Sequence, residues 1–274
     1  MAPQRFSILN SDFEIATVDP SLAAGVLAMT ATYPRTAQTP SHRFVLNRVG
    51  PLPGQEETLV LRGDGEVRYT TEHEGDLLAA LELDLYNYAL TESRDGVLLH
   101  AAAVARGGRA LVLAGPSGAG KSTLALALTA SGAGYVTDEW VQVAAGLRVR
   151  GVARPIGLEA PPAELDSRFE VFEHGARTAT GATTSLRLVH PPRERLHHGA
   201  ASLVALVFIE VQPGAIAELR PLPIAESLIH LGGCLVTGGA ALLDTATALL
   251  GDCPTYRLVS GDIAAAAAKL ESLW

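Results

Sequence analysis

Residues 110–131 have the sequence ALVLAGPSGAGKSTLALALTAS, and this stretch decides the expected fold. Residues 110–114 are all apolar, which is typical of a strand that is buried on both faces. Residues 115–122 match the pattern G-x-x-x-x-G-K-[ST], a glycine-rich loop that joins a strand to a helix. Residues 123–131 have helical spacing and end before Gly132. The order of strand, loop and helix predicts an α/β core.

Apolar patterns divide the rest of the chain into two expected domains. Residues 1–94 hold short apolar runs, a Gly63-Asp64-Gly65 turn and a closing helix at 76–90, which predicts a small β-rich α+β domain. Residues 95–274 alternate strands with helices, which predicts the larger α/β domain. The strands expected there are 98–104, 110–114, 135–137, 141–143, 147–152, 203–211 and 256–259, and the helices are 123–131, 161–165, 224–231, 240–250 and 263–273.

The glycine-rich loop predicts a site for a polyphosphate. Glycines let successive backbone N–H groups turn inward around an anion, and the positive end of the following helix strengthens the field. Lys121, one of only two lysines in the chain, would reach the β- and γ-phosphates, and the Ser122 hydroxyl would bind Mg²⁺. The residues expected to bind ATP are Gly115, Pro116, Ser117, Gly118, Ala119, Gly120, Lys121, Ser122 and Thr123.

Two carboxylates follow the strand predicted at 135–137. The carboxyl ends of strands in an open α/β sheet face the ligand, so Asp138 could hold Mg²⁺ together with Ser122. Asp138 or Glu139 could also accept the proton of an attacking hydroxyl. Neighbouring strand residues point to opposite faces, so both can serve only where the chain bends. The alternative is a solvated acidic turn.

His100 stands among apolar residues in the strand predicted at 98–104, which we expect beside the strand of the loop. A lone histidine in such a strand is more often a buried core residue than a functional one. Its imidazole is nevertheless the side chain best suited to proton exchange near neutral pH. Both interpretations follow from the pattern alone.

Residues 98–143 resemble the catalytic core of HPr kinase/phosphorylase and its shorter relatives. The matching features are Leu99-His100-Ala101, Gly107-Gly108, the loop with its flanking strand and helix, and Gly134-Tyr135-Val136-Thr137-Asp138-Glu139. The resemblance implies a P-loop kinase core with a fold related to phosphoenolpyruvate carboxykinase, in which the sheet is mixed. It also implies that His100 and the acidic pair lie beside the γ-phosphate. His100 would then orient a carboxylate base, and Asp138 or Glu139 would bind Mg²⁺ and deprotonate the acceptor.

This sequence departs from that family at two places. Glu139 stands where the family usually has a second aspartate, and its longer side chain places the carboxylate differently. The glutamate–isoleucine–arginine–glycine signature of the true HPr kinases is missing, which implies that phosphorolysis and HPr as a substrate are lost. Arg154-Pro155 stands where the shorter relatives have an arginine–proline pair. Arg154 could therefore contact a phosphate, and the alternative is a surface arginine.

The composition excludes several classes of function. The 274 residues carry a net charge of −8, which argues against a protein that coats nucleic acid. The apolar run 203–209 is too short to span a bilayer, and no apolar leader follows Met1, so we expect a cytoplasmic protein without a membrane partner. Cys234 and Cys253 are too few for a disulfide framework and lack metal-ligand spacing.

Two functions remain open. A kinase would bind ATP and Mg²⁺ at 115–122 and transfer the γ-phosphoryl group to a serine-type hydroxyl on a peptide, a protein or a small molecule. Residues 1–94 would then be the place for acceptor recognition. The alternative is a nucleotide-binding regulatory ATPase or switch, which has no acceptor and no need for a base. His100 and the acidic pair favour the kinase. The sequence identifies neither the acceptor nor whether the chain forms a homo-oligomer.

Overall fold

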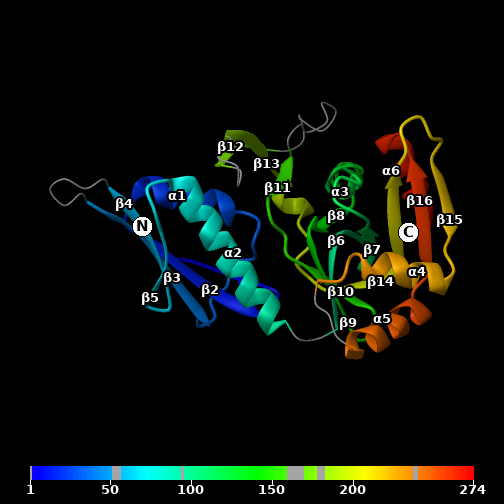
Figure 1. The fold of residues 1–274 in the computed structure, drawn as a ribbon, viewed down its shortest axis with the longest axis horizontal. Coiled ribbons are helices and arrows are strands. Elements are labelled where there is room, and N and C mark those ends of the chain that lie inside the picture. The colour runs from blue at the N-terminus through cyan, green and yellow to red at the C-terminus, as the bar shows by residue number, and fades with distance from the viewer. Residues whose placement is uncertain (1, 51–56, 94–95, 159–169, 178–182, 237–239) are drawn as a thin grey trace. The chain divides into compact units, whose positions relative to one another are not determined.

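The computed structural model describes residues 2–50, 57–93, 96–158, 170–177, 183–236 and 240–274 (Figure 1). The chain is an α/β protein with mixed sheets, as the sequence predicts. No helix within these described ranges is both long enough and apolar enough to cross a membrane. The chain divides into two compact units. Unit 1 comprises Met1–Arg94, Gly157–Ala160 and Val171–Val189, and unit 2 comprises Asp95–Ile156, Pro161–Glu170 and His190–Trp274.

Unit 1 contains a five-stranded sheet with the order β1-β2-β3-β4-β5. Strand β2 is parallel to β3, and the other neighbours are antiparallel. Alternate residues of β2 are buried, because helices α1 and α2 contact this sheet. The elements are β1 (Gln4–Ile8), β2 (Ser11–Thr17), α1 (Pro20–Met29), β3 (His42–Val49), β4 (Thr58–Gly63), β5 (Glu66–Thr71) and α2 (Glu74–Glu92).

The prediction of a single helix in residues 1–94 is wrong, because α1 is a second one. The carboxylate of Asp19 accepts hydrogen bonds from the backbone N–H groups of Ser21 and Leu22, and Pro20 occupies the first turn. An acidic N-cap followed by proline is a standard helix start, and the sequence interpretation overlooked it. The turn at Asp64 and Gly65 is confirmed, with both residues at positive φ between β4 and β5.

A three-stranded sheet has the order β11-β13-β12. Its strands are β11 (Ile156–Leu158), β12 (Glu170–Arg177) and β13 (Thr183–His190). This sheet was not predicted from the sequence. The helix expected at 161–165 lies outside the described residues.

Unit 2 is built on an eight-stranded mixed sheet. The main path is β10-β9-β6-β7-β14-β16-β15, and β8 pairs with β6. Strand β7 is antiparallel to β6 and parallel to β14, which is in turn parallel to β16. The strands are β6 (Val97–Arg106), β7 (Arg109–Ala114), β8 (Gly134–Thr137), β9 (Trp140–Ala144), β10 (Arg148–Gly151), β14 (Ala201–Val211), β15 (Glu218–Pro221) and β16 (Thr255–Ser260).

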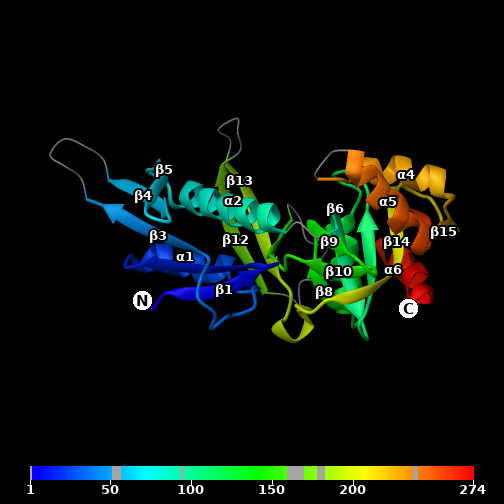
Figure 2. The same cartoon turned by 90° about the horizontal axis from the view of Figure 1, so that it is seen from below.

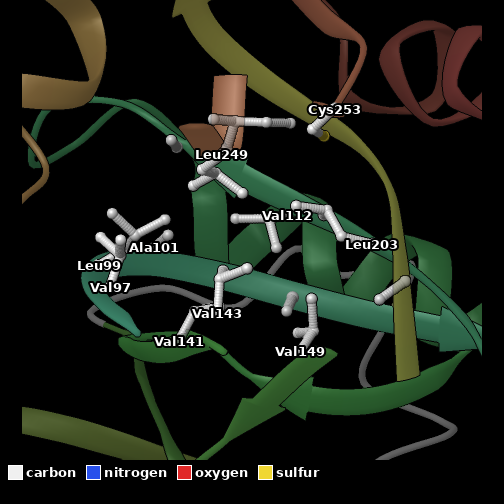
Figure 3. Packing of buried hydrophobic residues seen from close by; sticks show 14 of the residues in the cluster. Val97, Leu99, Ala101, Val112, Val141, Val143, Val149, Leu203, Leu249 and Cys253 are labelled. Carbon is white, nitrogen blue, oxygen red and sulfur yellow. The ribbon is translucent and has the colours of Figure 1, made fainter. Parts of the chain in front are cut away.

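Helices cover both faces of this sheet, which explains why β7 is apolar on both sides. Leu111 and Leu113 pack in one core cluster with α3 and α6. Val112 faces the other way and packs in a second cluster with Leu249 and Cys253 (Figure 3). Figure 2 shows the helices of the second face, α4 and α5, next to each other. The helices are α3 (Lys121–Ala130), α4 (Ile224–Gly232), α5 (Ala240–Asp252) and α6 (Ile263–Leu270).

Candidate active site

The glycine-rich loop leaves the carboxyl end of β7 and enters α3, as the sequence predicts. Gly120 is the N-cap of α3 with φ 79°, a left-handed conformation that strains any residue with a Cβ. A Cβ on Gly115 would lie 2.9 Å from the backbone oxygen of Ile209 in β14. Both glycines are therefore required by the local geometry. The exposed tip of the loop consists of Pro116, Ser117 and Gly118.

Lys121 begins α3 and is buried against the loop. Its Nζ donates to the backbone oxygens of Gly115 (2.9 Å) and Pro116 (3.0 Å), so the side chain folds back across the loop that precedes it. Burial lowers the pKa of the Lys121 ammonium, and the carboxylates of Asp138 and Glu139 are among the charges that oppose this. The buried Lys121 ammonium therefore lies at the N-terminus of α3, where the backbone dipoles also favour an anion.

Ser122 follows Lys121 in α3, and its side chain lies beside Asp138. The Ser122 hydroxyl lies close enough to the Asp138 carboxylate to lower the pKa of that group. Burial raises the pKa of Asp138, while the charge of Arg154 and hydrogen bonds from Tyr135 and Ser122 act in the opposite direction. Thr123 follows in the same turn and is partly buried. A hydroxyl and a carboxylate are therefore adjacent beside the loop.

This pair suits Mg²⁺ better than the transition metals. Mg²⁺ is usually held by one or two protein oxygens, with phosphate oxygens and waters completing its octahedron. Ser122 and Asp138 supply such oxygens. Among the described residues no group of three or more histidine, cysteine, aspartate and glutamate side chains could hold a metal ion. The donor set thus fits a magnesium ion that is shared with a bound phosphate.

The chain bends at Asp138 and Glu139. These neighbouring residues are therefore not held on opposite faces of one strand, which is the condition under which both carboxylates can serve one site. These two residues lie between β8 and β9, which pair with successive stretches of the same strand, β6. The hydroxyl oxygen of Thr137 lies 3.3 Å from the backbone nitrogens of Glu139 and Trp140 and accepts from both. These two hydrogen bonds stabilise the bend. The Asp138 carboxylate contacts Tyr135, whereas the Glu139 carboxylate contacts Arg154.

Glu139 forms an ion pair with Arg154, which follows β10. The side chains of Glu139 and Arg154 are 32% and 17% exposed, so both remain accessible from solvent. Arg154 also acts electrostatically on Asp138 and lowers its pKa. The structure therefore places Arg154 with the two carboxylates. It is not an isolated surface arginine.

His100 lies on β6 directly opposite Trp140 of β9, and the two ring centroids are 5.8 Å apart. Its backbone N–H donates to the carbonyl oxygen of Cys234 at 2.7 Å. Burial and the nearby Lys121 ammonium lower the pKa of His100, and Asp138 raises it. The lowered pKa favours the neutral imidazole, in which one nitrogen can donate and the other can accept. The charge of Asp138 thus acts on both His100 and Lys121, and Ser122 lies beside the same carboxylate.

The role of Tyr135 in this arrangement was not predicted from the sequence. Tyr135 is fully buried, and its hydroxyl lies 3.0 Å from Oδ1 of Asp138 and 3.1 Å from the backbone oxygen of Arg154. A buried tyrosine needs a partner for its hydroxyl, and a carboxylate three residues later was the available signal. Cys234 is a free, buried cysteine, as its sequence context predicts. Burial raises the pKa of its thiol, and a backbone hydrogen bond from Gly115 and the Lys121 ammonium act in the opposite direction.

No family model matches the chain, and a search of curated proteins found no match either.

Proposed function

We propose that the chain is a kinase that binds ATP with Mg²⁺ at the glycine-rich loop and transfers the γ-phosphoryl group to a serine-type hydroxyl. The observation that carries the proposal is the buried ammonium of Lys121 folded back across the glycine-rich loop, with the Ser122 hydroxyl and the Asp138 carboxylate close to each other beside it. A phosphoryl-transfer site needs a cation, a metal-binding pair and a base next to a phosphate loop. The resemblance of residues 98–143 to HPr kinase supports the same function.

Each site residue of unit 2 has its own role in the proposed reaction. The loop amides and Lys121 would bind the β- and γ-phosphates, and Ser122 with Asp138 would hold Mg²⁺. The metal would supply neutralisation of the charge that develops on the phosphoryl oxygens. Asp138 is then engaged, which leaves Glu139 to accept the proton of the acceptor hydroxyl. Arg154 fixes the direction of the Glu139 carboxylate, and the neutral imidazole of His100 orients the acceptor or the base by a hydrogen bond.

The acceptor would approach the carboxylate of Glu139. Glu139 is the site carboxylate whose side chain remains a third exposed, at 32%, whereas Asp138 is engaged by Tyr135 and Ser122. We further propose that residues 1–94 recognise the acceptor, because the chemistry described above uses none of them. A peptide, a protein segment or a small alcohol would satisfy the same site.

The test is transfer of label from γ-labelled ATP in the presence of Mg²⁺, free serine, seryl peptides and an extract of the source cells. We expect label in an acceptor with the wild type and none with Lys121→Ala. Lys269→Ala is the matched control, because it removes the only other lysine, which is exposed on α6. Release of phosphate without any labelled acceptor would assign the chain to the regulatory ATPases or switches instead.

A further inference from the structure

One face of the five-stranded sheet of unit 1 remains exposed in the described part of the chain. Side chains alternate between the two faces of a strand. The other face packs against α1 and α2 with fully buried residues such as Phe44 and Leu61. We define the open face by side chains of β2 to β5, none of which is buried: Ala16, Arg43, Val45, Val60, Arg62 and Val67.

Aliphatic side chains form a row across the open face. Cross-strand pairing places four neighbours in line, in the order Ala16, Val45, Arg62 and Val67. Val45 and Val67 are 37% and 51% exposed, and Val60 precedes Arg62 on β4 and points to the same side. A sheet face that meets only solvent usually carries polar side chains. Exposed valines that adjoin one another therefore indicate a binding surface.

The guanidinium groups of the open face are accessible. Glu14 accepts from Arg5 at 2.6 Å and lies 3.5 Å from Arg43. The Glu14 side chain is only 15% exposed, whereas that of Arg43 is 61% exposed. Arg62 is also exposed, and its Nη1 donates to the backbone oxygen of Gly65 at 3.5 Å. Within the described ranges Arg62 forms no ion pair with a carboxylate, so its charge is available to a partner.

Positive charge exceeds negative charge on this side of the sheet. Its second carboxylate, Asp12, accepts from the Ser7 hydroxyl at 2.6 Å. Of the described residues of β1 to β5, three arginines and two carboxylates thus point to the open side. The whole chain, in contrast, carries a net charge of −8. A local excess of arginine on an acidic protein favours an acidic partner at this face.

The width of the row argues for a polypeptide as that partner. Neighbouring strands lie about 4.8 Å apart, so the row from Ala16 to Val67 spans roughly 14 Å. A small alcohol would cover only part of this row. A second copy of the chain would bring the same excess of arginine to the contact, because a two-fold interface pairs identical surfaces. A different polypeptide with acidic side chains avoids that repulsion.

We infer that the open face binds a segment of a polypeptide acceptor in which aspartate or glutamate side chains stand beside aliphatic ones. The inference rests on the proposed function and narrows it, because the acceptor is then a polypeptide and not a free small alcohol. Val45, Val60 and Val67 would cover the aliphatic side chains of the segment. Arg43 and Arg62 would pair with its carboxylates. Unit 1 thus selects the acceptor, and unit 2 carries out the transfer.

The test selects random peptides displayed on phage against the full chain, with counter-selection on the Arg62→Glu variant. The selected sequences are synthesised with a fluorescein label, and fluorescence anisotropy gives their dissociation constants. We expect acidic and aliphatic residues to be enriched in these sequences. Their affinity should fall as the salt concentration rises, because exposed charges are screened.

Three variants of the full chain separate the contributions to peptide binding. Arg62→Glu should weaken binding by about tenfold or more, because it reverses a charge that faces the peptide. Val45→Thr should weaken binding by roughly threefold, because it replaces one methyl group by a hydroxyl and keeps the β-branched shape. Leu83→Asp is the matched control and should change binding by less than about twofold. Leu83 is 61% exposed on α2, which packs on the other face of the sheet.

Three results would overturn the inference. The first is a selection that yields no peptide, or only peptides that bind Arg62→Glu as tightly as the wild type. The second is enrichment of basic sequences. The third is a dimer of the wild type that Arg62→Glu dissociates in sedimentation equilibrium, because the open face would then belong to a second copy. Arg62 and Val45 are both exposed, so their substitution leaves the buried core of unit 1 intact.

A kinetic measurement separates this inference from the proposed function. The selected peptides, each extended by a serine, are offered as acceptors with γ-labelled ATP and Mg²⁺. A KM for the peptide that is about tenfold higher in Arg62→Glu, at unchanged kcat, supports the inference. Label transfer with equal KM values in both proteins contradicts it and leaves the kinase proposal intact. Peptide binding that depends on Arg62, without label transfer to any acceptor, leaves the docking face and overturns the kinase proposal.

Discussion

The hydroxyl of Tyr135 lies 3.0 Å from the Oδ1 atom of Asp138, inside a part of unit 2 where the tyrosine is fully buried. The same hydroxyl lies 3.1 Å from the backbone oxygen of Arg154. It has a single proton, which it can donate to either oxygen. The direction of the Asp138 carboxylate thus depends on a residue for which the proposed chemistry has no direct role.

Tyr135→Phe removes this hydrogen bond and keeps the ring. We expect kcat for phosphoryl transfer to fall by roughly tenfold, which corresponds to about 1.4 kcal/mol of transition-state stabilisation. The dissociation constant for ATP should change by less than about twofold, because the loop is untouched. Steady-state kinetics and titration calorimetry measure the two quantities. Tyr69→Phe in unit 1 is the control, and a Tyr135→Phe enzyme with an unchanged kcat would contradict a positioning role.

Asp138→Asn should stabilise the metal-free protein at neutral pH. Burial raises the pKa of Asp138 above its ordinary value of 3.8, so the folded state holds its proton to a higher pH than the unfolded state does. The stability that this group contributes is therefore lost as the pH rises through its folded pKa. Asparagine does not ionise, so we expect a gain on the order of 1 kcal/mol at pH 7 to 8 that disappears toward pH 4.

Urea unfolding in EDTA between pH 4 and pH 8 measures this difference. The wild type and Asp138→Asn should converge at the acid end and separate as the pH rises. Asp244→Asn, an exposed residue of α5, provides the matched control. A variant that is less stable than the wild type at pH 8 would mean that the ionised carboxylate stabilises the fold. In the same variant, the proposed magnesium pair predicts loss of Mg²⁺-dependent turnover.

Glu139→Gln should lower kcat by about 10²- to 10⁴-fold, the usual contribution of a general base. ATP affinity should stay within about twofold of the wild type, because Glu139 lies outside the loop. Glu139→Asp should recover part of the activity, since it keeps a carboxylate at this position. Equal loss of activity in the Gln and Asp variants, or none in the Gln variant, would remove Glu139 from the base role.

Gly120→Ala should cost about 1–2 kcal/mol in the free energy of unfolding, because the left-handed φ of 79° strains a residue with a Cβ. The nearest atoms to the added Cβ, from Ile263 and Val211, are 3.7 Å away, so steric overlap does not contribute. Gly251→Ala in α5 is the control, because nothing lies within 4 Å of its added Cβ. Denaturant unfolding of both variants checks the prediction, and equal stabilities would contradict it.

The parts of the fold that were predictable from the sequence are those set by local patterns. The order β7, loop and α3 follows from an apolar run, three glycines and a helical repeat that are contiguous in the chain. Strand β14 and helices α4 to α6 have equally clear periodicity. Helix α1 also had local signals in Asp19 and Pro20, and these were overlooked. The sheet of β11, β12 and β13 lacks a local signal that fixes its pairing.

The parts of the candidate site that were not predictable depend on pairing across the sheet. The bend at Asp138 and Glu139 exists because β8 and β9 both pair with β6, whose paired residues lie 29 to 46 residues earlier in the chain. The ion pair of Glu139 with Arg154 arises because β9 and β10 form a hairpin that returns the chain to the bend. Periodicity within one strand contains no information about such partners.

The ratio of phosphate ester formed to ADP formed tests the kinase proposal most directly. It is measured with γ-labelled ATP, Mg²⁺ and the seryl acceptors and extract described above. Transfer to a hydroxyl predicts a ratio close to one with the matching acceptor, with both products abolished by Lys121→Ala and retained by Lys269→Ala. A ratio near zero, with ADP and orthophosphate formed in equal amounts under every condition, would contradict phosphoryl transfer to an acceptor.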